Sequence, residues 1–488
     1  MLRYLTLSPI RITDYEDRQM AKKLHLYNTL SRQVEELKTL VPNEVRLYCC
    51  GPTVYNYQHI GNLRTYIFED LLTRTLRAAG YSVKHVMNIT DVGHLVSDAD
   101  EGEDKMLVAM RREKKKSAEI AQFYTDIFFK HCEQLHIKRP DVVCKATEHV
   151  REMIELIQRI EKRGFTYISG GNVYFDISKL SDYGKLAQLD LQKLMAGARI
   201  EVDSNKRNPQ DFVLWFTKSK FENQELQWES PWGTGYPGWH IECSAMAMRY
   251  LGDAFDIHCG GIDHIPVHHT NEIAQSEAAT GHPWVHHWMH GEFLVFNKEK
   301  MSKSSGGFIT LDTVTERGID PLAYRFFCLG AHYQAQLSWS WEALENAAQS
   351  LTKLKANVIA LKAEAKEPSP DLDASAQEHL DSFYAAFFND LNAPKGLAVL
   401  WNALGDKRLS ASMKLALVYK LDEILGLDMQ SWKESQVEAP AAVLALLAQR
   451  GEARAAKNWP EADRLRLEIE KAGFLVEDVK GVQKLKSK

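Results

Sequence analysis

An alternation of strand, glycine-bearing loop, helix and strand near the start of the chain constrains the fold more than any other feature. Residues 45–50 (VRLYCC) have the β-rich pattern of a buried strand, which Gly51-Pro52-Thr53 interrupts. Gly61 then begins a helix of about five turns that ends at Gly80, and residues 81–89 form the next strand. Because two consecutive strands joined through a helix run parallel, this βαβ unit predicts an α/β domain built on a parallel sheet.

The rest of the chain predicts a second half of the same sheet, followed by helices. Residues 106–163 are interpreted as two helices separated near Pro140. Strand-like sequence returns at 254–259 before Gly260-Gly261, and a helix follows from His268 to about Ala279. The predicted organisation is an N-terminal extension (1–22), the first half of a parallel-sheet domain (23–130), a connective insertion (131–235), the second half of the sheet domain (236–290), a loop and stem-contact region (291–345), a helical bundle (346–437) and a small C-terminal module (438–488).

Charge and cysteine content narrow the class of protein. The 488 residues carry a formal net charge of −5, which excludes a uniformly basic nucleic-acid coat but leaves room for a local basic groove. Seven cysteines in a long chain indicate free or metal-binding thiols in a reducing compartment. No apolar run approaches the ~18 residues that span a bilayer, and residues 1–20 lack the apolar core of a signal peptide. We therefore expect a cytoplasmic protein that does not contact a membrane.

Two short motifs are candidates for binding phosphates. His59-Ile60-Gly61-Asn62 begins the first long helix, where unpaired backbone N–H groups can bind an anion. Alone, this motif is more often an ordinary helix cap. Lys300-Met301-Ser302-Lys303-Ser304 places two lysines around small hydroxyls, which suits charge that develops on a departing pyrophosphate, although a bare lysine-rich loop is more often only solvated. The two motifs in this order, some 240 residues apart, are much more specific than either one.

This pair of motifs resembles the signature of the class I aminoacyl-tRNA synthetases. The resemblance implies a Rossmann-like catalytic domain in which His59, Asn62, Lys300 and Lys303 act on ATP and its Mg²⁺. Asn62 stands where the family often has a second histidine, and its amide can still donate a hydrogen bond.

A third constellation has the composition of a metal site. Cys50 closes the first strand, Cys243 lies in the run 237–244 (PGWHIECS), and His268 and Glu272 are four residues apart on one helix face. Two thiolates, an imidazole and a carboxylate form a donor set typical of zinc. Taken singly, each residue is more often a buried thiol or an ordinary helix residue, so only the combination favours a metal.

The sequences around these four residues resemble the cysteinyl-tRNA synthetase family over about residues 23–480. The motifs are 50–55 (CGPTVY), 237–246 (PGWHIECSAM) and 268–276 (HHTNEIAQS). The resemblance implies zinc held by Cys50, Cys243, His268 and Glu272. The candidate residues of the substrate pocket are Gly51, Thr53, Thr90, Trp239, Asp263 and His269, of which Thr53, Thr90 and Asp263 follow the ends of predicted parallel strands, where ligands bind in such sheets.

The activity implied is ligation of L-cysteine to tRNA(Cys) through a cysteinyl-adenylate, by a monomer with a C-terminal anticodon-binding module. Packing alone distinguishes cysteine from serine only by about 1–3 kcal/mol, whereas a soft metal that bonds the substrate thiolate discriminates far better. Two alternatives stay open. One is a ligase that joins cysteine to an amino-sugar, which would not need the helical bundle and the C-terminal module. The other is a non-catalytic binding relative, which should have lost some metal or lysine residues.

Overall fold

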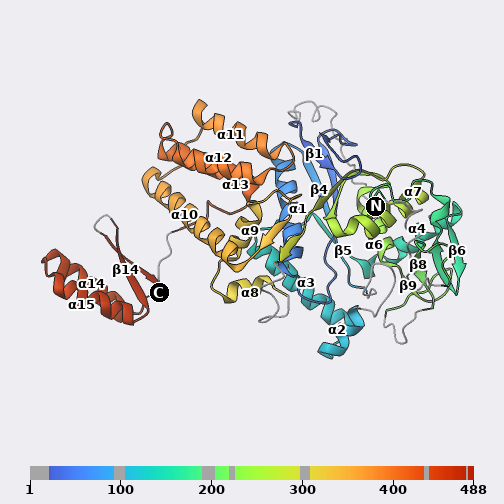
Figure 1. Ribbon diagram of the computed structural model, residues 1–488, viewed down its shortest axis with the longest axis horizontal. Coiled ribbons are helices and arrows are strands. Elements are labelled where there is room, and N and C mark those ends of the chain that lie inside the picture. Colours follow the sequence, from blue (N-terminus) through green and yellow to red (C-terminus); the bar gives the residue numbers. More distant parts are fainter. Residues whose placement is uncertain are drawn as a thin grey trace, which may run out of the picture. The chain divides into compact units, whose positions relative to one another are not determined.

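The computed structural model describes residues 21–92, 105–188, 204–218, 226–296, 308–433, 439–479 and 482–487, which belong to two compact units (Figure 1). Unit 1 covers Met1–Gln430 and unit 2 covers Ser431–Lys488. Within the described residues, no helix combines the length and the apolar character that crossing a bilayer requires.

A five-stranded sheet in the order β11-β10-β3-β4-β5 forms the centre of unit 1. Every neighbouring pair of its strands is parallel. The strands are β3 (Glu44–Cys49), β4 (Ser82–Ile89), β5 (Val142–Lys145), β10 (Phe255–Gly261) and β11 (Val285–Gly291). The structure thus confirms the predicted parallel α/β fold, and the two halves of the sheet meet where β3 pairs with β10.

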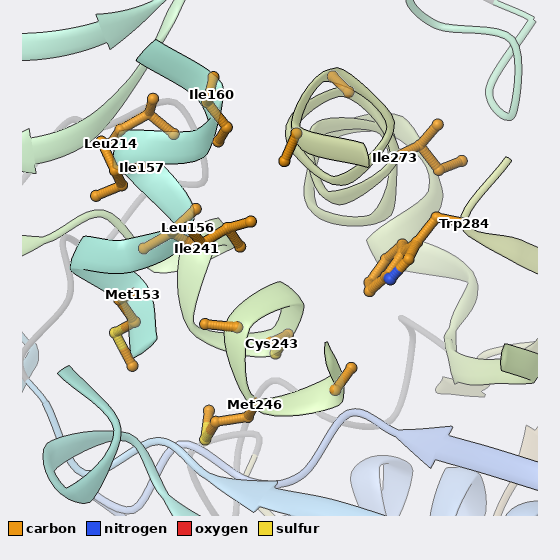
Figure 2. Packing of buried hydrophobic residues seen from close by; sticks show 14 of the residues in the cluster. Met153, Leu156, Ile157, Ile160, Leu214, Ile241, Cys243, Met246, Ile273 and Trp284 are labelled. Carbon is orange, nitrogen blue, oxygen red and sulfur yellow. The ribbon is translucent and has the colours of Figure 1, made fainter. Parts of the chain in front are cut away.

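Helices cover both faces of this sheet. The βαβ helix α1 (Ile60–Ala78) contacts β4 and β10, and α6 (Trp239–Leu251) contacts β3 and β4. A buried apolar cluster joins α6 to α4 (Val150–Lys162) and α7 (Thr270–Thr280), and Figure 2 shows Met153, Ile241 and Cys243 within it. Tyr48 of β3 belongs to the same cluster, so α6 lies between the sheet and the other two helices.

The segment 105–163 differs from the predicted pair of helices. It contains three helices, α2 (Lys105–Glu113), α3 (Ser117–Gln134) and α4, and the short strand β5 lies between α3 and α4. Val142 and Val143 favour extended backbone, but four residues are too few to show a strand period in the sequence. β5 pairs with β4 and becomes the edge of the central sheet, so this sheet includes part of the predicted insertion.

The remainder of the insertion contributes three strands to a separate antiparallel sheet, and the fourth strand lies just after its predicted end. The four strands of this sheet are β6 (Thr166–Ser169), β7 (Asn172–Phe175), β8 (Phe212–Phe216) and β9 (Tyr236–Pro237). The last of them leads directly into α6, which carries Cys243. A hairpin of β1 (His25–Asn28) and β2 (Gln33–Glu36) precedes the central sheet.

Residues 294–425 continue unit 1 with a strand pair and a helical bundle. The parallel strands are β12 (Leu294–Phe296) and β13 (Leu337–Trp339), and the helices are α8 (Leu311–Glu316), α9 (Pro321–Leu329), α10 (Trp341–Ala365), α11 (Ala374–Phe387), α12 (Ala393–Gly405) and α13 (Ala411–Leu425). Helix α13 contacts α10, α11 and α12, and the four helices are drawn in orange in Figure 1.

A buried charge cluster connects α1 to the bundle. The Asp70 carboxylate of α1 accepts hydrogen bonds from Arg74 Nε at 2.7 Å and from Arg325 Nη2 of α9 at 2.6 Å. Arg325 also donates to the carbonyl of Leu425, at the end of α13. The side chains of Asp70 and Arg325 have no exposed surface, so this cluster joins three helices that are distant in the sequence.

Unit 2 contains α14 (Ala441–Ala455), α15 (Trp459–Lys471) and the antiparallel strands β14 (Phe474–Val479) and β15 (Val482–Ser487). The buried residues Val443, Ile469 and Val476 pack together between the helices and this hairpin. The lysine-rich end of the chain, which the sequence presents only as a tail, therefore supplies a strand.

Candidate active site

A cavity of about 280 Å³ opens where β3 and β10 separate from one another. In open parallel sheets, loops leave two adjacent strands in opposite directions at such a point and make room for a ligand. The cavity brings together six candidate residues from three parts of the sequence: Gly51, Thr53, His59, Asn62, Trp239 and Asp263. Cys50 lies in its wall as well.

His59 is the N-cap residue of α1 and is one of the cavity side chains. Its Nδ1 accepts a hydrogen bond of 3.1 Å from the backbone N–H of Asn62, so the ring proton belongs on Nε2. Burial lowers the pKa of His59, which keeps the ring neutral at neutral pH. The start of the helix therefore offers the cavity both backbone N–H groups and an imidazole donor.

Behind the cavity lies a buried cluster of metal-ligating side chains. Cys50 follows β3, Cys243 lies on α6, His268 lies in a π-helical turn (Ile265–His269), and Glu272 lies in the first turn of α7. One ligand atom from each of the four lies within 4.8 Å of the other three. The structure thus assembles the four predicted ligands, although they are separated by up to 222 residues of sequence.

The electrostatics of this cluster suit a cation. Burial alone would raise the pKa of Glu272, but the adjacent His268 and His258 lower it below its usual value. The contact with Cys50 lowers the pKa of the Cys243 thiol despite its burial. Glu272 Oε1 lies 2.7 Å from His268 Nε2, yet it has no hydrogen bond of normal angle among the described residues. A buried carboxylate oxygen in this position is available to a metal ion.

Histidines surround the four ligands and hold them in place. His258 Nε2 lies 2.7 Å from Glu272 Oε2, and His240 Nδ1 lies 3.0 Å from His268 Nδ1. His269 Nε2 lies 3.3 Å from Cys50 Sγ, so an alternative cluster of Cys50, His258, His269 and Glu272 shares two ligands with the first. Such outer partners orient metal ligands and fix the histidine tautomers.

Comparison with known proteins identifies the family. The pattern described as "tRNA synthetases class I (C) catalytic domain" matches residues 36–349, and "Cysteinyl-tRNA ligase anticodon binding domain" matches residues 436–484. The cysteine–tRNA ligase of Treponema denticola is 50% identical over 484 residues, covering 94% of this chain and 98% of that protein. The chain belongs to the cysteine–tRNA ligase family. Cysteine–tRNA ligase 1 of Burkholderia lata is 46% identical over 463 residues, covering 95% of this chain and 96% of the relative.

Solved structures agree on the fold. Methionyl-tRNA synthetase of Mycobacterium tuberculosis, bound by methionyl-adenylate, matches with a TM-score of 0.56 at 16% identity, covering 86% of this chain and 96% of that one. The LeuRS of Agrobacterium radiobacter K84, in complex with tRNA and LeuAMS, matches with a TM-score of 0.55 at 12% identity over 81% and 85% of the two chains. The class I architecture is therefore shared by this member of the cysteine–tRNA ligase family.

Two other predicted residues of this family member lie outside the cavity lining, and the structure does not describe two more. Thr90 and His269 are buried outside the cavity lining. Thr90 donates a 3.2 Å hydrogen bond to Glu242 of α6, which ties the end of β4 to that helix. Lys300 and Lys303 lie outside the described residues.

Sequence reasoning missed several residues around the cavity. Tyr55, Tyr57, His264 and Phe308 line it, and burial lowers the pKa of His264 to about 4. His290, at the carboxyl end of β11, lies 2.7 Å from His269 and 2.8 Å from Thr29. The end of a parallel strand is a signal that could have identified His290, whereas the tyrosine positions depend on the path of the loop.

The close approach of the backbone at Gly51 predicts how a substitution there changes the stability of this cysteine–tRNA ligase relative. A Cβ at residue 51 would lie 1.6 Å from the carbonyl oxygen of Asn88 in β4, so the loop that follows β3 approaches the β4 backbone too closely for any side chain. We expect Gly51→Ala to lower the free energy of unfolding by at least about 1–3 kcal/mol, because the loop must move. Gly405→Ala, where a Cβ meets nothing within 4 Å, is the control and should change stability by less than about 1 kcal/mol. Equal urea transitions for the Gly51→Ala variant and the unmodified chain would contradict the steric argument.

Proposed function

We propose that this chain ligates L-cysteine to tRNA(Cys) at the expense of ATP, through a cysteinyl-adenylate. The observation that carries the proposal is the position of the Cys50, Cys243, His268 and Glu272 cluster directly beside the cavity that holds His59. The relatives named cysteine–tRNA ligase, which match over nearly their whole length, support the same activity.

Zinc is the metal that the donor set fits best. Two thiolates, one imidazole and one carboxylate form a four-coordinate set of the kind that zinc prefers. A zinc ion held there would bond the sulfur of cysteine as a thiolate, which the hydroxyl of serine does not match near neutral pH. His258 and His240 would then orient Glu272 and His268 from outside the ligand set.

The cavity residues supply positioning and charge stabilisation for two displacement steps. In the first step, a carboxylate oxygen of cysteine bonds to the α-phosphorus of ATP, and the bond from that phosphorus to the bridging oxygen breaks to release pyrophosphate. His59 Nε2–H and the N-terminus of α1 donate to phosphate oxygens as charge moves onto the leaving group. In the second step, a terminal ribose hydroxyl of tRNA bonds to the carbonyl carbon, and AMP departs.

The remaining ATP contacts are assigned to Asn62, Lys300 and Lys303, with Mg²⁺ on the phosphates. Phe308 lines the cavity, and the backbone of Ile60 at the start of α1 donates to the carbonyl of Ile309. Asp263 and Thr53 in the wall are assigned to the nucleotide and Trp239 to cysteine, because its ring lies 4.7 Å from that of His268.

Unit 2 is assigned to the tRNA anticodon, on the basis of the family match over residues 436–484. Trp459 is 54% exposed there, and the guanidinium of Arg454 lies 5.7 Å from its ring. An exposed aromatic side chain beside a cation can stack on an unpaired base.

A cytoplasmic location and a monomeric state complete the proposal. The seven free cysteines agree with a reducing compartment.

Two assays test the proposal on the purified full chain. We expect about one zinc per chain, and ATP–pyrophosphate exchange that depends on cysteine and that serine does not support. Charging of tRNA(Cys) with cysteine then separates this activity from ligation of cysteine to an amino-sugar. Absence of both zinc and cysteine-dependent exchange would overturn the proposal, and exchange without tRNA charging would favour the amino-sugar ligase.

A further inference from the structure

The turn between α2 and α3 is the most basic short segment near the active-site cavity. Residues 111–116 read RREKKK, five cations and one acid, in a chain whose net charge is −5. All five cations, Arg111, Arg112, Lys114, Lys115 and Lys116, are exposed. We call residues 111–116 the basic turn.

Contacts connect the basic turn to the wall of the cavity. Arg112 Nη2 donates to the carbonyl of Tyr55 at 3.3 Å, and Tyr55 lines the cavity. Arg112 also donates to the hydroxyl of Tyr124, whose ring lies 5.2 Å from that of Tyr57, a second cavity residue. The basic turn is therefore held at the edge of the cavity by hydrogen bonds and by packed aromatic rings.

An exposed aromatic side chain lies between the basic turn and the cavity. Phe123 of α3 is 40% exposed, and its ring contacts Tyr57 on one side with the centroids 6.5 Å apart. Lys115 Nζ lies 4.8 Å from the centroid of the same ring. Cations that follow a strand's phosphates, combined with an aromatic face on which a base can stack, form the usual surface for a single-stranded nucleic acid.

Local structural roles account for only part of this charge. Arg111 and Arg112 lie in the last turn of α2, where a cation complements the helix dipole. The acid in the segment, Glu113, is already within 2.7 Å of Arg112. Lys114, Lys115 and Lys116 lie beyond the end of α2, and only Lys115 is near Glu113, at 3.8 Å. The helix dipole and Glu113 do not explain three consecutive lysines.

We infer that the basic turn binds the phosphates of the single-stranded 3′ end of tRNA and guides it past Phe123 into the cavity. This inference rests on the proposed function, because only a tRNA-charging enzyme must bring the end of an RNA strand to this cavity. The overall negative charge makes such a local cluster necessary, since the average surface repels a polyanion. Lys114 and Lys115 contact the backbone, and Phe123 provides the stacking face.

The salt dependence of tRNA charging tests the inference in the full chain. We expect Lys114→Ala with Lys115→Ala to lower kcat/KM for tRNA(Cys) about tenfold at about 50 mM salt. The slope of log kcat/KM against log salt concentration should also become shallower by about 0.7 for each lysine removed, which misfolding would not produce. Lys114→Arg with Lys115→Arg should keep both values close to those of the unmodified chain, because the salt slope depends on the number of phosphates that cations neutralise.

A matched control removes two exposed cations elsewhere. Arg151 and Lys162 lie at the two ends of α4, and the variant Arg151→Ala with Lys162→Ala should keep the slope of the unmodified chain. An equal change of slope in this control would show a general charge effect and overturn the inference. An unchanged slope in the Lys114/Lys115 variant would also overturn it. Failure of the proposed function is distinct, because the unmodified chain would then lack cysteine-dependent pyrophosphate exchange.

Discussion

Replacing Cys243 by serine is expected to remove the bound metal and to lower kcat/KM for cysteine in pyrophosphate exchange by at least about 100-fold. Loss of an outer partner of a metal site typically costs 10- to 100-fold, so loss of a thiolate ligand should cost more. Cys243 is 2% exposed and lies within 4.8 Å of the ligand atoms of Cys50, His268 and Glu272, so a serine there would leave the cluster with one thiolate donor instead of two. Metal analysis of the purified variant and exchange rates with cysteine and with serine measure the effect.

Cys259→Ser is the matched control for this experiment. Cys259 is a fully buried thiol on β10, and it pairs in register with Cys49 of β3 rather than with the metal ligands. Cys259→Ser replaces a buried thiol by a hydroxyl, as Cys243→Ser does, but at a residue outside the proposed ligand set. The Cys259→Ser variant should therefore retain its metal and its preference for cysteine. If the Cys243→Ser variant keeps one metal per chain and exchanges as fast as the control, the assigned ligand set is wrong.

Asp70→Asn is expected to lower the free energy of unfolding of unit 1 by about 3–5 kcal/mol. The substitution leaves the buried Arg325 beside a neutral partner, and an uncompensated buried charge has a cost of this size. The shift of the urea transition, followed on the full chain, measures the loss. Asp253→Asn is the control, because Asp253 forms an exposed pair with Arg159 at 2.7 Å and should contribute no more than about 1 kcal/mol.

The pH dependence of the stability difference between the unmodified chain and the Asp70→Asn variant gives a second test. Burial alone would raise the pKa of Asp70, but Arg325 and Arg74 lower it below its usual value in the folded chain. A lowered pKa contributes stability that is fully present above the unfolded pKa of about 3.9 and is lost as pH falls through the folded value. The gap between the unmodified chain and the Asp70→Asn variant should therefore be full at pH 7 and shrink only below about pH 4. A gap that stays constant into strong acid would show that the Asp70 charge is not its source.

The sequence predicted those parts of the molecule whose signals are local or whose residue types are chemically unusual. The βαβ unit around α1 was readable because its hydrophobic pattern and its glycines lie within about 45 residues. The four proposed metal ligands could be grouped because the motifs around them resemble those of the cysteinyl-tRNA synthetase family, since seven cysteines and 18 histidines allow many other sets. The family resemblance indicated which distant segments of the chain come together. The period of the hydrophobic pattern alone does not contain that information.

Features that depend on tertiary contacts were not predictable in the same way. β5 is too short for its period to be seen, and its role as an edge strand depends on pairing with β4. The contact between His290 and His269 forms only because β11 lies beside β10. Thr90 was expected in the pocket because it ends a strand, yet its side chain is buried against Glu242. In each case a contact with residues distant in the sequence determines the position of the strand or of the side chain.

The four proposed metal ligands come from distant parts of the sequence, which has a consequence during protein synthesis. Cys50 is translated more than 220 residues before Glu272, and ribosomes add about 5–20 residues each second. The Cys50 thiol therefore exists for about 10–45 seconds before the chain that completes its ligand set has been made. During that interval it is exposed to oxidants and to other metals. Cells short of reducing power or rich in copper should accumulate newly made, inactive chains while the chains already folded continue to work.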